Sequence, residues 1–77
     1  MLRTQVPKLL AEEIVDGRFK PETVEAIPVD GHKALRLRAD GRTVFVVGSE
    51  AVKLASYLRR DKPDIADLIE ALLPEIS

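Results

Sequence analysis

Side chains able to do chemistry are few in this chain of 77 residues, which has one histidine and no cysteine. His32 follows a glycine in a predicted turn and has no obvious nucleophile to serve as a general base. Asp61, Asp64 and Asp67 have the oxygen ligands that Mg²⁺ uses, but acids in this position also stabilise the first turn of a helix. A chain this short leaves little room for a substrate pocket of about 300 Å³. We therefore expect no enzyme activity, no metal or cofactor, and no small-molecule substrate.

Basic side chains are concentrated in the middle of the chain. Four lysines and arginines lie between residues 31 and 43, against one acid, Asp40. A two-stranded ribbon with arginines on one face can enter the major groove of DNA, and basic residues elsewhere can contact phosphates. The formal net charge of −1 argues against a nucleic-acid-binding domain, which is usually basic. Nucleic-acid binding is therefore the alternative function, and its candidate residues are Lys33, Arg36, Arg38, Arg42, Arg59 and Arg60.

Two Asp-Gly pairs indicate how these side chains are positioned. Asp30-Gly31 and Asp40-Gly41 each separate two segments rich in strand-forming residues, and Asp-Gly favours two-residue type I′ turns. Such turns predict antiparallel strands at 23–29, 32–39 and 42–47. Directly opposed residues share one face of a sheet. One face of the predicted sheet therefore contains only apolar residues, namely Val24, Ala26, Leu35, Leu37, Val44 and Val46.

Apolar residues at helical spacing predict three helices, at 6–16, 50–60 and 63–73. Ser49 is the expected N-cap of the second helix, and Pro74 is expected to end the third. The order of elements is then α-β-β-β-α-α. This order predicts a single α+β domain over residues 1–77, with a three-stranded antiparallel β-meander, one N-terminal helix and two C-terminal helices. The apolar stripe of the first helix consists of Val6, Leu9, Leu10 and Ile14.

The second face of the predicted sheet combines apolar and charged residues. Ile27, Ala34 and Val47 form a row across the three strands, and Phe45 lies beside Arg36 in the next row. If this face is exposed, it can bind a second copy of the chain or another protein, because aromatic and arginine side chains dominate binding hot spots. In the alternative arrangement the first helix covers this face, and Phe45 is then a core residue.

The three predicted helices offer more apolar surface than one face of the sheet can cover. A three-stranded sheet is about 14 Å wide, and helices pack about 8–10 Å apart, so one face accommodates two helices. The third helix must stack on its neighbours, cross to the second sheet face or bind another chain. We therefore predict a small non-enzymatic regulatory or accessory protein that acts by binding protein, either another protein or a second copy as a homodimer. The candidate partner-binding residues are Ile27, Ala34, Arg36, Phe45, Val47, Ile65, Leu68 and Leu72.

Composition adds two expectations about where the protein works. No apolar run approaches the ~20 residues of a membrane span, and the first residues lack the apolar segment of a signal peptide, so we expect a cytoplasmic protein without membrane contact. Asn is absent and Gln5 is the only Gln. Depletion of such thermolabile residues is a trend of heat-adapted proteins.

Overall fold

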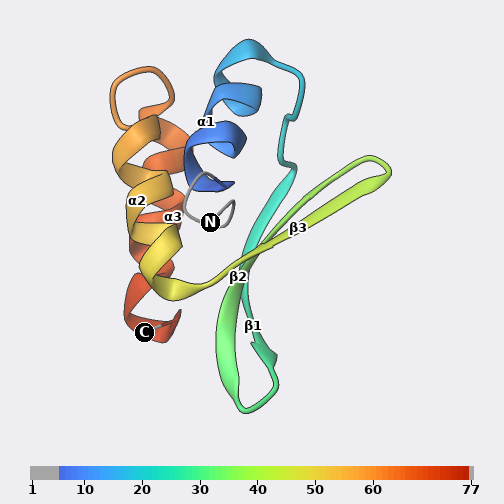
Figure 1. Ribbon diagram of the computed structural model, residues 1–77, viewed down its shortest axis with the longest axis vertical. Helices are drawn as coiled ribbons and strands as arrows, with labels where there is room; N and C mark the ends of the chain where they lie inside the picture. The colour runs from blue at the N-terminus through green and yellow to red at the C-terminus, as the bar shows by residue number, and fades with distance from the viewer. Residues whose placement is uncertain (1–5, 77) are drawn as a thin grey trace.

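The computed structural model describes residues 6–76, of which Val6 is described by its backbone alone (Figure 1). Three strands form one antiparallel sheet in the order β1-β2-β3. This confirms the predicted α+β class, with one N-terminal helix, a β-meander and two C-terminal helices. None of the described helices is long and apolar enough to cross a membrane. The elements are α1 (Val6–Asp16), β1 (Thr23–Val29), β2 (His32–Ala39), β3 (Arg42–Val46), α2 (Gly48–Leu58) and α3 (Pro63–Ile76).

The strand register is the one that the two Asp-Gly turns predict. Leu35 of β2 lies opposite Ala26 of β1 and Val46 of β3. Leu35 and Leu37 are fully buried, whereas Arg36 between them is only half-buried. Because neighbouring residues of a strand point to opposite faces, a slip of one residue would have exchanged these environments. The predicted assignment of residues to the two sheet faces is therefore confirmed.

The two hairpin turns differ in their backbone conformation, which the sequence did not predict. Asp30 and Gly31 have φ values of 50° and 86°, as a type I′ turn requires. At the second turn Gly41 has a φ of 77°, but among the described residues Asp30 is the only non-glycine residue with a positive φ. The turn at Asp40 is therefore not type I′. It has the φ pattern of a type II turn, which places glycine in the same position and keeps the two-residue loop.

Four predicted element boundaries are wrong, and one of them is the start of α2, which lies at Gly48 and not at residue 50. Strand β3 ends at Val46, and Val47 is the extended N-cap of α2, so Ser49 lies inside the helix. Helix α2 ends at Leu58, two residues before its predicted end. Helix α3 continues through Pro74 to Ile76. The side chain of Ile76 is 2% exposed, and the burial of this side chain offsets the backbone hydrogen bond that proline removes.

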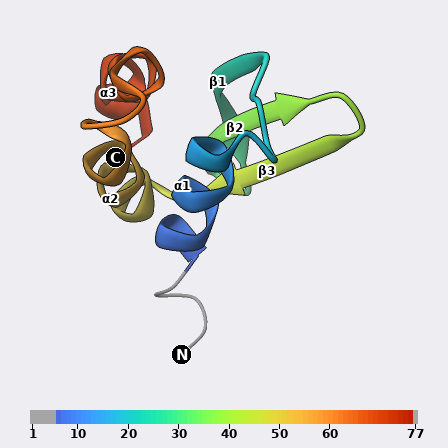
Figure 2. The same cartoon turned by 90° about the horizontal axis from the view of Figure 1, so that it is seen from above.

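All three helices pack on the same face of the sheet (Figure 2). Leu10, Ala11 and Ile14 of α1 belong to one buried cluster with Leu35 and Leu37. Helix α1 also packs against α2. The third helix therefore stacks on its neighbours, and the arrangement in which α1 covers the second sheet face is wrong.

The apolar stripe of α1 also differs from its prediction. Leu9 is 56% exposed, while Ala11 is buried in its place. The side chain of Val6 lies outside the described residues. Because α1 contacts α2 as well as the sheet, the buried part of its surface is rotated toward Ala11, and Leu9 stays on the surface beside β3.

Candidate functional site

The candidate site is the sheet face that turns away from the helices, here called the outer face. Phe45 is 54% exposed on it, and Val47, which follows β3 in an extended conformation, is 45% exposed. Ala34 is 3% exposed although it does not belong to the core cluster. Ile27, its partner across the strands, is half-buried, so neither of these two predicted partner-binding residues is an exposed anchor. The outer face consists of Thr23, Glu25, Ile27, Ala34, Arg36, Arg38, Thr43, Phe45 and Val47.

An ion pair lies at the centre of the outer face. The guanidinium of Arg36 donates a hydrogen bond to Glu25 Oε1 across the two strands, and both side chains are partly buried. The Nε atom of Arg36 is buried and has no hydrogen-bond partner among the described residues. The pair leaves this part of the face without net charge, and it holds the Arg36 side chain in the row that Phe45 occupies.

The basic residues that could bind nucleic acid do not form one surface. Arg36 and Arg38 lie on the outer face, whereas Lys33 and Arg42 lie on the helix side. Lys33 Nζ is 3.8 Å from Glu75 of α3. A guanidinium nitrogen of Arg42 is 2.7 Å from Glu13 of α1, and the Arg42 guanidinium also covers the Phe19 ring at 4.8 Å from its centroid.

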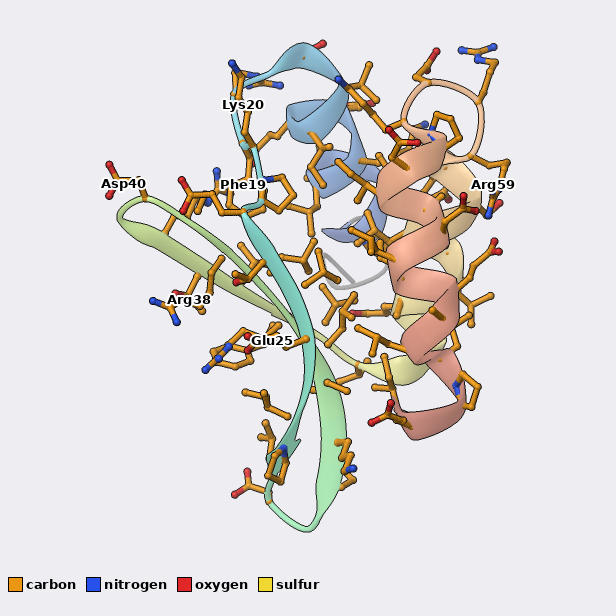
Figure 3. The ribbon with its side chains drawn as sticks, turned by 180° about the vertical axis from the view of Figure 1, so that it is seen from behind. Phe19, Lys20, Glu25, Arg38, Asp40 and Arg59 are labelled. Carbon is orange, nitrogen blue, oxygen red and sulfur yellow. The ribbon has the colours of Figure 1, made fainter. Side chains whose placement is uncertain are left out.

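The other two basic candidates lie after α2, far from the outer face. Figure 3 shows Arg38 directed away from the helices and Arg59 on the opposite side of the molecule. Arg59 pairs with Glu70 at 2.6 Å and with Asp67 at 2.7 Å, and these carboxylates raise its pKa. Arg60 Nε lies 3.6 Å from Asp61. Of the six candidates, Arg38 alone has no ion pair within residues 6–76, and this arrangement does not favour a nucleic-acid surface.

The acidic residues of α3 also serve structural contacts. Asp67 binds Arg59, and Asp64 lies in the first turn of α3, where it stabilises the positive end of the helix dipole. Within the described residues no group of His, Asp or Glu is arranged to hold a metal ion.

The remaining partner-binding candidates on α3 do not form one exposed stripe. Ile65 and Leu72 are half-buried and pack against the core, while Leu68 is 54% exposed. Leu68 is therefore the only one of these three side chains that is exposed. Single exposed leucines are ordinary on protein surfaces, and this part of α3 adds little to the candidate site.

Two further features bear on chemistry. His32 is exposed where β2 begins. A groove of about 360 Å³ runs between α1 and α2, which is more space than the chain length led us to expect. Its walls hold acidic, basic and aromatic side chains, and it opens widely to solvent. The lining residues are Lys8, Ala11, Glu12, Val15, Asp16, Tyr57 and Asp61.

Sequence reasoning missed two surface features that bear on binding. One is the exposure of Leu9 beside Val44, where the two residues line a small hollow of about 150 Å³ with Leu10, Glu13 and Arg42. The other is which side chains lie beside the edge strand β3. The meander already implied this edge, and only the packing of α1 showed which side chains lie next to it.

The chain was compared with protein families, with curated proteins and with solved structures, and no match was found in any of the three comparisons. The fold and the site define a small α+β domain in which no helix covers one face of the sheet.

Proposed function

We propose that this chain is a small non-enzymatic module that binds another protein through the outer face of its sheet. The observation that carries the proposal is the exposure of Phe45 and Val47 on a face that none of the three helices covers. Large apolar side chains that are contiguous on a surface commonly mark a protein-binding site. The row of Phe45 also contains Arg36, and aromatic and arginine side chains are enriched at binding hot spots.

The charge of the outer face supports a protein partner over a nucleic acid. Glu25 neutralises Arg36, and only Arg38 contributes unpaired charge. A surface with so little net charge gains little from counterion release, which dominates binding to nucleic acid. A protein partner that presents apolar side chains and one carboxylate near Arg38 satisfies the same surface.

Site-specific crosslinking tests the proposal. A photoreactive phenylalanine analogue replaces Phe45 in one preparation and Val52 of α2 in a control, because these side chains have nearly equal exposures of 54% and 52%. Each protein is irradiated alone and with extract of the cells that make it. We expect discrete crosslinked products from position 45 that disappear when Arg36→Ala and Val47→Asp are added. Equal crosslinking from positions 45 and 52, or none from position 45, contradicts the proposal.

A further inference from the structure

We infer that a second copy of the same chain joins this one through the free edge of β3, so that two sheets become one. The inference goes beyond the proposed function, because the edge of β3 is separate from the outer face and the dimer leaves both outer faces open to a protein partner. Each copy contributes three strands, and the continuous sheet presents both outer faces on one side.

The free edge of β3 presents backbone groups that are unpaired within residues 6–76 and are arranged to pair with another strand. The Glu22 N–H donates to the Arg38 carbonyl at 2.6 Å, so the backbone groups of Arg38 face β1. In an antiparallel ladder its partner Thr43 then directs its own N–H and C=O away from β2, and by alternation Phe45 does the same. Within residues 6–76 no backbone hydrogen bond outside the ladder reaches these groups. Such an edge is a template for a further strand.

The other edge of the sheet is better protected. Strand β1 contains Pro28, which cannot donate a backbone hydrogen bond, and Glu25. Helix α3 also packs against β1. Strand β3 has neither proline nor lysine, and the charge of Arg42 is neutralised by Glu13. The devices by which proteins prevent edge pairing are therefore present on one edge and weak on the other.

The sequence of β3 is complementary to itself in a two-fold antiparallel arrangement. A two-fold axis at Val44, the middle residue of β3, is the register that pairs every residue of the strand with a residue of its copy. Thr43 then lies opposite Phe45 of the other copy, and these two residues are the ones with free backbone groups, so each such pair exchanges both hydrogen bonds. Val44 faces its own copy on the helix side. Arg42 lies opposite Val46, so no like charges meet.

The same arrangement covers an apolar side chain that the monomer leaves exposed. Leu9 of α1 is 56% exposed and lines the hollow next to Val44. Because the axis passes through Val44, the hollows of the two copies lie on either side of it. The second copy thus covers the surface beside Leu9, and its outer face continues that of the first copy beyond Phe45.

Hydrogen exchange on the native chain tests the inference without any substitution. Sedimentation equilibrium over a concentration series gives the fraction of dimer, and amide exchange is followed by NMR in the same samples. We expect exchange at Thr43 and Phe45 to slow by about tenfold when nine-tenths of the chain is dimeric, because only the monomer exposes these amides. The amides of Val44 and Val46 point to β2 and are already protected in the monomer, so they are expected to exchange much more slowly than those of Thr43 and Phe45 at low concentration.

A matched pair of variants provides the second test. Thr43→Pro removes the edge N–H and is expected to weaken the dimer by at least about tenfold, whereas Thr43→Val keeps the N–H and leaves the dimer intact. A monomer at every concentration overturns the inference. A dimer whose Thr43 and Phe45 amides exchange as in the monomer also overturns it. In either case discrete crosslinks from position 45 would still support the proposed function, so the two failures are distinguishable.

Discussion

The two phenylalanines of the chain show how differently one residue type can be used. Phe19 is 2% exposed and lies in the core under the guanidinium of Arg42, whereas Phe45 is 54% exposed on the outer face. Both follow segments of similar polarity, so composition does not distinguish them. A buried aromatic ring contributes hydrophobic and packing energy, while a ring that stays exposed contributes little to folding and is available for binding.

This difference makes a prediction about stability. Phe19→Ala should lower the free energy of unfolding by about 3–5 kcal/mol, and Phe45→Ala by less than about 1 kcal/mol. Urea unfolding followed by circular dichroism measures both values. If Phe19→Ala does not fold, Phe19→Leu should still cost about 1–2 kcal/mol. An equal loss for the two alanine variants would show that Phe45 is a core residue, and the outer face would lose its main anchor.

The ion pairs of the chain fix the positions of several arginine side chains. Glu13 holds Arg42 over Phe19, Glu25 holds Arg36 on the outer face, and two acids of α3 hold Arg59. Those of the pairs that are exposed contribute little to stability. The larger effect of the ion pairs is that most basic side chains are already paired. The positive charge of the hairpin is therefore largely neutralised within the molecule.

At the scale of elements, α3 depends on two prolines in opposite situations. Pro63 is the first residue of the helix, where its missing N–H removes no intrahelical hydrogen bond. Pro74 lies inside the last turn, where an ordinary residue would donate to the carbonyl of Glu70. The helix nevertheless continues past Pro74, because Ile76 reaches the core.

We expect the two positions to respond oppositely to alanine. Pro74→Ala should raise the free energy of unfolding by about 1–2 kcal/mol, since it restores a backbone hydrogen bond and improves helix propensity. Pro63→Ala should leave stability unchanged or lower it by about 0.5 kcal/mol, because the unfolded chain gains freedom. Thermal unfolding of both variants beside the native chain measures the effect. A loss of stability in Pro74→Ala would mean that the proline shapes the last turn in a way that Ile76 needs.

At the scale of the whole molecule, one core joins all the elements. Side chains of α1, β2, β3 and the two C-terminal helices belong to a single buried cluster, and Val24 and Ala26 of β1 pack against it. A chain of this size has no second core that could remain folded when the first is lost. Helix α1 is therefore expected to unfold together with the sheet.

Unfolding should accordingly show one transition by every probe. Tyr57 of α2 is the only tyrosine, and the chain has no tryptophan, so its fluorescence reports on α2 while circular dichroism reports on the whole backbone. The two curves should coincide, and Ile14→Ala in α1 should shift both by the same amount, about 2–4 kcal/mol. Val15→Ala at the neighbouring exposed position should shift them by less than about 1 kcal/mol. Two separate transitions would show that α1 or the helical layer folds on its own.

The candidate site was partly predictable for the same reasons as the fold. The positions of Phe45 and Arg36 on one sheet face follow from turn chemistry and the two-residue period of strands. The exposure of that face does not follow from them, because α1 could have packed on either side. Helical spacing places Ile65, Leu68 and Leu72 on one side of α3. Ile65 and Leu72 nevertheless pack against the core. Spacing identifies which residues share a face and leaves open how much of that face another element covers.

By itself the amino-acid sequence determined the strands, their register and the two faces of the sheet, since turns and side-chain alternation depend on interactions between residues that are close along the chain. The tertiary structure decided that all three helices pack on one face, that Leu9 stays exposed, that α3 runs through Pro74, and that the edge of β3 is open. These features depend on competition among elements for a limited buried surface. An amphipathic stripe indicates that one side of a helix is buried. The packing of the whole chain determines which element covers that side.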